Sequence, residues 1–365
     1  KQSSVESISN LCADINKGDI STLFILGGNP VYDAPSDLNF SDTLSKVKHV
    51  AHLTLFENET TKASKWRVPA SHYLEMWDDA VAIDGSVTLV QPLIRPMYES
   101  VPYLNLVARL TGSKKGDYSQ VRQTWRQRTS VGFQRKWEKW LHDGVVYGPS
   151  KSSYGDEFVS SKFLSEIRKA LDVNRGNAYI EAVFYSDYSL FDGRFNNNSW
   201  LQELPDPITK LTWDNTALIS SNTAKKLSIK TEDIVRITVE GKEIDVAFMV
   251  FPGIADDSIS LYLGYGREVT GRVGERTGFD VGPLRTSTSM NWVTGLTLFN
   301  TKETYKLATT QDHGSMEGRP QYREATVDDY EKHPNFANEQ VHVPYDKSLF
   351  EEVTYDKGYQ WGMAI

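Results

Sequence analysis

The sequence predicts an α/β fold in which a βαβ-type domain is followed by a small β-barrel and an extended C-terminal arm. Two changes of periodicity support this prediction. Up to about residue 190, short apolar runs alternate with helical patterns, and past residue 208 apolar residues recur at every second position. After residue 305 neither period is present. We therefore expect domains over 1–190 and 208–305, a linker over 191–207 and an arm over 306–365.

The first predicted domain alternates strands and helices. Apolar residues at helical spacing predict an opening helix over 5–15. The apolar run 23–26 stops at the turn residues 27–30, as a buried parallel strand does, and a second apolar strand covers 50–56. This pattern is typical of a βαβ unit. The remaining expected elements are helices over 101–110, 121–141 and 158–171 and a strand over 179–185.

The linker and the second domain differ from the first in composition and period. Asp-Gly, Asn-Asn-Asn, Pro205 and Pro207 favour turns and extended backbone. Alternating apolar residues then predict antiparallel strands over 244–250 and 259–263, and Glu240-Gly241 predicts a hairpin turn. A small β-barrel is the expected closure of these strands.

Composition narrows the classes of function. The 365 residues include 40 basic and 48 acidic ones, a net charge of -8, so we expect no basic field that could attract nucleic acid or anionic lipid. The single cysteine, Cys12, excludes an internal disulfide and an iron–sulfur cluster, which needs about four thiolates. No apolar run reaches the roughly eighteen residues of a membrane span. Both ends look cut, and we expect the chain to belong to a longer polypeptide.

Motifs that carry chemistry are mostly missing. Gly264-Tyr265-Gly266 is followed by glycine only at Gly271, which departs from dinucleotide-binding spacing. His49 and His52 fall on a predicted strand, where a spacing of three points them to opposite faces. The chain has no Gly-x-Ser-x-Gly nucleophile elbow. The sequence therefore predicts no catalytic residue and no metal ligand.

Several motifs nevertheless occur in an order that identifies a family. They are Leu26-Gly27-Gly28-Asn29-Pro30, Glu59-Thr60, the stretch 68–75, Gln91-Pro92-Leu93-Ile94-Arg95-Pro96, the stretch 200–210, Glu232-Asp233-Ile234-Val235 and Leu263-Gly264-Tyr265-Gly266. This set resembles the C-terminal half of the molybdopterin oxidoreductases, with their third domain and their dinucleotide-binding β-barrel. The closest likeness within the family is the large molybdopterin-like, iron–sulfur subunit of bacterial alternative complex III, in which a molybdopterin-like part without molybdenum is fused to a ferredoxin-like part.

The resemblance implies a scaffold without a redox centre in this segment. Residues 358–365 are similar to the sequence that precedes the cysteine-rich ferredoxin-like domain, so iron–sulfur clusters are expected on that adjoining domain. The implied partners are a membrane quinol-binding subunit and cytochrome c subunits, at the periplasmic face of the bacterial inner membrane. Neither nucleic acid nor a direct membrane span is expected.

Two other functions stay open from the sequence. The chain could be the C-terminal half of an active molybdenum-dependent reductase of the tetrathionate or polysulfide type. A weaker alternative is a free-standing sugar or nucleotide binder that uses the βαβ loop.

Three residues are candidates for a vestigial pocket edge, chosen by motif position alone: Asn29, Glu59 and Asn291. The glycines and the proline of the 27–30 loop fit a turn that the fold requires as well as a pterin-binding loop. Arg67 stands where active members of the family commonly have a short apolar residue before the proline, which argues further against a bound cofactor.

Overall fold

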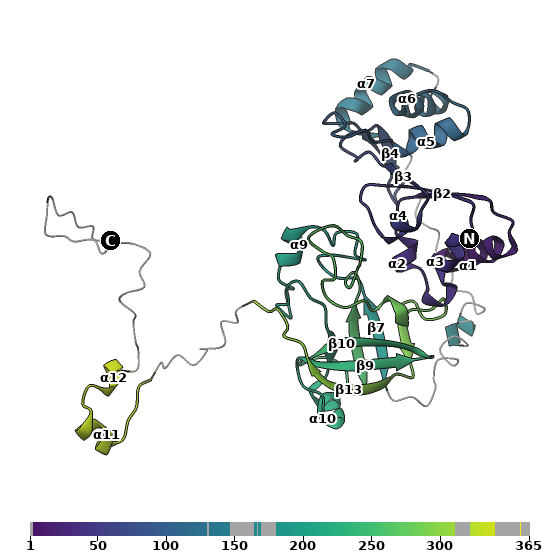
Figure 1. Cartoon of the computed structure of the whole chain (residues 1–365). Helices are drawn as coiled ribbons and strands as arrows, with labels where there is room; N and C mark the ends of the chain where they lie inside the picture. The colour runs from purple at the N-terminus through teal and green to yellow at the C-terminus, as the bar shows by residue number, and fades with distance from the viewer. Residues whose placement is uncertain are drawn as a thin grey trace. The chain divides into compact units, whose positions relative to one another are not determined.

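A computed structural model gives the fold (Figure 1) and describes residues 3–129, 131–146, 164–165, 167–168, 180–310, 322–339 and 358. Residues 1–310 and 311–365 form two compact units. The helix expected over 158–171 falls mainly outside the described residues.

The predicted βαβ unit is confirmed. Its three strands pair in parallel in the order β1, β2, β3. They are β1 (Thr22–Leu26), β2 (His49–Thr54) and β3 (Trp66–Pro69), with α2 (Pro30–Asp33), η1 (Ser36–Leu38) and α3 (Phe40–Ser45) in the first connection and α4 (Glu59–Ala63) in the second. Helix α1 (Ser4–Lys17) begins at the capping side chain of Ser3 and ends at Gly18, whose left-handed φ of 84° closes it. Cys12 and Ile15 of α1 are buried in the core of this unit.

A second group of elements, which we call the helical lobe, covers residues 77–146. Its antiparallel sheet joins β4 (Asp78–Val81), β5 (Val87–Val90) and β6 (Val145–Val146). The helices α5 (Tyr103–Leu110), α6 (Asp117–Arg128) and α7 (Phe133–Asp143) lie beside this sheet in Figure 1. Trp125 and Trp137 are buried between helices and sheet. Apolar spacing predicts the helices. The small sheet is not among the expected elements, although Asp84-Gly85 between alternating apolar residues is a signal for the hairpin of β4 and β5.

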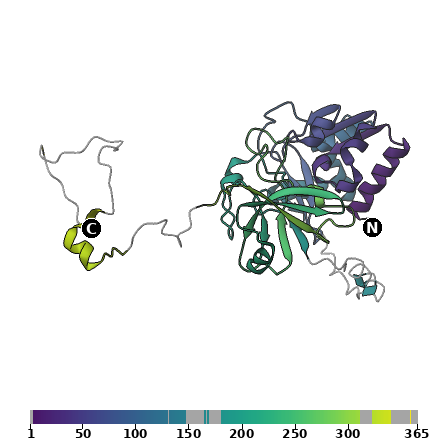
Figure 2. The ribbon, with the colours of Figure 1, turned by 60° about the horizontal axis from the view of Figure 1, so that its bottom comes forward.

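The largest sheet has seven strands in the order β12, β7, β11, β8, β10, β9, β13. They are β7 (Glu181–Tyr185), β8 (Ala217–Ile219), β9 (Asp233–Val239), β10 (Lys242–Val250), β11 (Ser258–Tyr262), β12 (Trp292–Thr294) and β13 (Thr297–Thr304), accompanied by α9 (Ser199–Glu203), α10 (Ser221–Leu227) and η2 (Gly282–Leu284). The sheet curls as a half-barrel, which Figures 1 and 2 show from two sides. The predicted hairpin turn at Glu240-Gly241 joins β9 and β10.

Two expectations about this region are wrong. The predicted small barrel does not close, because β12 and β13 are opposite edges and do not pair with each other among the described residues. The strand expected at the end of the first domain, β7, pairs instead with β11 and β12 of the half-barrel. A strand's own pattern shows that it is buried but not which strand it will pair with. A boundary near residue 190 therefore does not separate the sheets, and the other predicted boundaries stay predictions.

The second unit is described only over 322–339 and at 358. The extended arm predicted over 306–365 is not extended throughout, because α11 (Val327–Lys332) and α12 (Phe336–Glu339) lie within it. Thr326 caps α11 by accepting a hydrogen bond from the backbone N–H of Asp329 at 3.2 Å. This capping pattern is local and is visible in the sequence without any apolar period.

In the described ranges we find no helix whose length and apolar character would allow it to cross a bilayer.

Gly266 lies where two backbone segments of the half-barrel meet. Its φ is +66°, and a Cβ added to it would overlap the backbone nitrogen of Asp280. Gly241, in the hairpin turn, has a φ of +75° and open space around the same position. The two glycines therefore share a left-handed conformation and differ in steric room.

We expect Gly266→Ala to lower the free energy of unfolding by about 3 kcal/mol, since it adds backbone displacement to left-handed strain. Gly241→Ala carries only the strain and should cost about 1 kcal/mol. Urea unfolding of both variants measures the difference. Equal losses would show that the close approach to Asp280 is not a constraint on the fold.

Candidate functional site

The loop after β1 is held by side chains from α4. Gly27 and Gly28 have φ angles of 71° and 73°, and the N–H of Gly27 donates to the carbonyl of Leu53 at 2.7 Å. Asn58, the capping residue of α4, donates from Nδ2 to the carbonyl of Gly28 at 3.1 Å. The turn is therefore tied to the end of the neighbouring strand and to the start of α4.

Asn29, predicted as a pocket-edge residue, uses both the oxygen and the nitrogen of its amide inside the protein. Its Oδ1 accepts hydrogen bonds from the N–H and the hydroxyl of Thr60, at 3.0 and 2.9 Å. Its Nδ2 donates to Oε2 of Glu59 at 2.6 Å. The hydroxyl of Thr60 accepts in turn from the N–H of Val31 at 3.0 Å. The structure thus brings the predicted residues Asn29 and Glu59 together.

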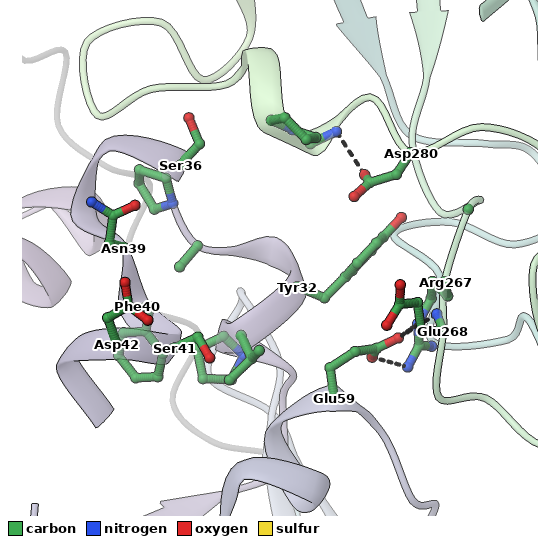
Figure 3. Close-up of a pocket in the computed structure, with 17 residues that line it drawn as sticks. Tyr32, Ser36, Asn39, Phe40, Ser41, Asp42, Glu59, Arg267, Glu268 and Asp280 are labelled. Atoms are coloured by element: carbon green, nitrogen blue, oxygen red, sulfur yellow. Dashed lines mark hydrogen bonds and ion pairs between the residues drawn. The ribbon is translucent and has the colours of Figure 1, made fainter. Parts of the chain in front are cut away.

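Glu59 joins the βαβ unit to the half-barrel. Its Oε2 accepts from Nη2 of Arg267 at 2.7 Å (Figure 3). Its Oε1 accepts from the N–H groups of Glu268 and Val269 at 3.1 and 3.0 Å. The side chains of Glu59 and Arg267 are 14% and 7% exposed. Burial raises the pKa of the Glu59 carboxyl, but the hydrogen bonds and charge of Arg267, with the bonds from Val269 and Asn29, outweigh burial and lower this pKa overall.

Arg267 makes further contacts of its own. Besides Glu59, its Nη1 donates to the carbonyl of Gly193 at 2.6 Å and its Nη2 to the carbonyl of Val269 at 3.1 Å. Its guanidinium lies 5.3 Å from the centre of the Tyr32 ring, in a cation–π contact. The hydroxyl of Tyr32 donates to the carbonyl of Tyr265 at 2.7 Å. Arg267 therefore fixes three segments that are distant in sequence.

A cavity of about 510 Å³, which we call the interface cavity, lies between α2, α3 and the half-barrel (Figure 3). Its lining includes Tyr32, Ser36, Asp42, Glu59, Arg267 and Asp280. Burial raises the pKa of Asp280 to about 6; the N–H of Gly282, which donates to it at 2.8 Å, opposes this rise, and the Glu59 charge adds to it. The same cavity therefore holds a paired carboxylate with a lowered pKa, Glu59, and one with a pKa raised to about 6, Asp280.

A second cavity of about 600 Å³, which we call the loop cavity, lies under the 27–29 loop. It is lined by residues 27–29, Asp33, 54–58, Tyr103, 192–195, 197–199, Arg267 and Thr270. Phe56 and Phe195 are 61% and 47% exposed. Arg194 is held by Asp192 through hydrogen bonds of 2.9 and 2.7 Å. Burial, and then the charge of Asp192, raise the pKa of the Asp33 carboxyl.

Asn291 does not join the other two predicted residues. It lines a third cavity, of about 560 Å³, between the start of α1 and the segment 287–292. Its backbone carbonyl accepts from the N–H of Phe184 at 2.8 Å. The vestigial role assigned to the three residues stays a prediction, and only Asn29 and Glu59 share a site.

Sequence reasoning does not select Arg267 or Asp280. The Gly264-Tyr265-Gly266 motif predicts only the end of a strand, although the arginine follows it immediately. The sequence does hold one signal of a distant partner. Glu59 has no basic residue at helical spacing except Lys62, which is exposed, so a cation that pairs with Glu59 inside the protein must come from elsewhere in the chain. His49 is half-buried, whereas His52 is fully buried with its Nδ1 3.0 Å from the hydroxyl of Thr61. Within the described ranges, no cluster of three His, Cys, Asp or Glu side chains is suited to hold a metal ion.

The contribution of the buried ion pair to the stability of the fold can be tested by substitution. Glu59→Gln leaves the Arg267 charge buried without its partner, and we expect a loss of about 3 kcal/mol in the free energy of unfolding. Glu57→Gln is the matched control, because Glu57 is 73% exposed and its contact with Arg67 is long, at 3.4 Å; it should cost about 0.5 kcal/mol or less. Urea unfolding measures both. Similar small losses would show that the βαβ unit and the half-barrel do not depend on Glu59.

The raised pKa of Asp280 predicts how the free energy of unfolding changes with pH. Its pKa rises from 3.8 to about 6 on folding, so its favourable contribution is fully present below about pH 4 and is lost as the pH rises through about 6. Asp280→Asn removes the charge and keeps the acceptor for Gly282. We expect the variant to gain on the order of 2 kcal/mol over the wild type between about pH 4 and about pH 8, measured by urea unfolding. A difference that does not change with pH would contradict this.

Comparison with known proteins places this geometry in context. No family model matches the chain. The chain is 23% identical over 290 residues to the menaquinone reductase molybdopterin-binding-like subunit of Nitratidesulfovibrio vulgaris (strain Hildenborough). The matched region covers 76% of this chain and 40% of that subunit. It is 35% identical over 75 residues to the assimilatory nitrate reductase catalytic subunit of Bacillus subtilis (strain 168), 20% of this chain and 11% of that one.

The fold is similar to that of acetylene hydratase from Pelobacter acetylenicus, with a TM-score of 0.55 and 14% sequence identity over 76% of this chain and 42% of the hydratase. The chain thus spans about two fifths of the length of these two longer matches. Sequence and fold agree with the ordered motifs described above. The chain is therefore molybdopterin oxidoreductase-like.

Proposed function

We propose that the chain is a scaffold segment, without a cofactor of its own, in a respiratory quinol:electron-acceptor oxidoreductase of the alternative complex III type. It would position an adjoining iron–sulfur domain and dock partner subunits. The relative from Nitratidesulfovibrio vulgaris is named as a subunit of a menaquinone reductase, which supports a place in a multi-subunit respiratory complex.

The observation that carries the scaffold role is the state of the polar groups around the 27–29 loop. A pterin dinucleotide brings a pyrophosphate, so its site needs cations or free N–H donors. The two arginines of the loop cavity, Arg194 and Arg267, are both paired with carboxylates, and the amide of Asn29 is hydrogen-bonded to Glu59 and Thr60. Three carboxylates line the same cavity: Asp33, Glu57 and Asp192.

These residues do not fit a pyrophosphate-bearing cofactor. Binding one would require breaking the Glu59–Arg267 pair or accepting repulsion from the lining carboxylates, and either costs several kcal/mol. We assign the retained loop a structural role: it anchors α4 and, through Glu59, the half-barrel.

On this proposal the protein lies at the periplasmic face of the bacterial inner membrane. Its partners would be a membrane quinol-binding subunit, cytochrome c subunits and the adjoining ferredoxin-like domain, which would hold the iron–sulfur clusters. A second candidate, the C-terminal half of an active molybdenum-dependent reductase, is favoured by the 35% identity to the nitrate reductase catalytic subunit, but over 75 residues only.

Metal and pterin analysis of the intact native protein separates the two functions. We expect molybdenum and tungsten well below one atom per chain, and no fluorescent pterin after oxidative release, because the loop cavity offers no unpaired cation for the pyrophosphate. Stoichiometric molybdenum with a pterin would overturn the scaffold proposal. The same analysis of a molybdopterin-containing reductase, purified in parallel, is the control for loss during preparation.

A further inference from the structure

The net charge of the protein is very unevenly distributed. Residues 103–143 contain nine Lys and Arg and three Asp and Glu residues, a formal charge of +6, whereas the whole chain carries -8. All other residues together therefore carry -14. Helices α5, α6 and α7 of the helical lobe make up most of this basic segment.

The charge is concentrated on the hairpin formed by α6 and α7, which we call the basic hairpin. Residues 118–137 contain no acidic side chain. They contain five basic ones: Arg122, Arg126, Arg128, Arg135 and Lys136. None of the five forms an ion pair with another described residue. The apolar sides of both helices are buried in the lobe through Val121, Trp125, Phe133 and Trp137, whereas Arg126, Arg135 and Lys136 are exposed.

Several of these cations are held in place by the lobe itself. Arg122 donates to Oε1 of Gln134 at 2.7 Å and lies 5.4 Å from the centre of the Phe133 ring. Arg128 lies 5.1 Å from the centre of the Trp125 ring. The basic surface is therefore ordered before any partner binds, which reduces the entropy lost on binding.

The placement of Arg135 and Lys136 works against the stability of α7. Both follow the first residue of the helix closely, and its first turn has no acidic residue. Cations at a helix N-terminus oppose the helix dipole, so local stability does not explain them. A local rule broken without compensation within the described residues points to a function for the exposed charge.

The tip of the basic hairpin carries an exposed apolar side chain. Val131 is 81% exposed and lies between Arg128 and Arg135 in sequence, next to Gly132. An apolar tip flanked by cations matches the layering of a bilayer surface, where anionic phosphates overlie the hydrocarbon. A soluble acidic protein would also match the cations, and the vesicle experiment below separates the two kinds of partner.

We propose that the basic hairpin docks the helical lobe onto an anionic phospholipid surface. The cations would contact lipid phosphates and Val131 would enter the headgroup boundary. The acidic remainder of the chain would be repelled by the same surface, so the protein would bind with the lobe foremost. The proposal rests on surface charge and does not depend on whether a cofactor is bound.

Sedimentation of the full chain with lipid vesicles tests the proposal. We expect binding to vesicles of phosphatidylglycerol and phosphatidylcholine, no binding to phosphatidylcholine alone, and release at high salt. The triple variant Arg126→Gln, Arg135→Gln, Lys136→Gln should bind the anionic vesicles on the order of a hundredfold more weakly. Glutamine keeps the helix propensity of these positions, and circular dichroism checks that the variant is folded.

The matched control removes the same charge elsewhere, through Lys48→Gln, Lys225→Gln and Lys230→Gln, which are exposed and lie outside the lobe. Its affinity should stay within about twofold of the wild type, because only charges near the lipid contribute. Equal weakening of both variants, binding to neutral vesicles, or no binding to anionic vesicles at low salt would each overturn the proposal. The last result would instead favour an acidic protein partner. None of these outcomes bears on the metal and pterin analysis.

Discussion

The buried ion pair between Glu59 and Arg267 is the constraint on which the rest of the fold depends. It is the point where α4 of the βαβ unit meets the loop after β11 of the half-barrel. A charge pair that is this well buried must be fully hydrogen-bonded to be tolerated. Asn29, two backbone N–H groups and two backbone carbonyls meet this requirement. The loop, the helix and the half-barrel are therefore positioned together.

The same pair occupies one of the two arginines of the loop cavity. The other, Arg194, is paired with Asp192, and three carboxylates line the same cavity. On the function proposed above, the fold keeps the shape of a cofactor-binding architecture while these charged groups serve its own stability. This is why the ordered motifs identify the family without identifying a reaction.

Local physical chemistry determines which parts of the fold can be predicted. The parallel strands β1 and β2, the turn at Gly27-Gly28 and the hairpin turn at Glu240-Gly241 depend on residues close in sequence. Glu59 is selected through its motif. The pairing of β7 with β11, the open edges of the half-barrel and the arrival of Arg267 at Glu59 depend on contacts across 70 or more residues. No period or spacing in the sequence specifies such contacts.

The charge distribution shows a further limit of composition. A net charge of -8 argues against an attraction to anionic surfaces only if charge is spread evenly over the molecule. Here the stretch 118–137 of the α6–α7 hairpin has no acidic side chain, and electrostatic attraction at ordinary ionic strength is decided within about 10 Å of the surface. The distant acidic residues are screened over that range and act mainly on orientation. The sign of the local surface, rather than the sign of the whole chain, therefore decides which surfaces this protein can approach.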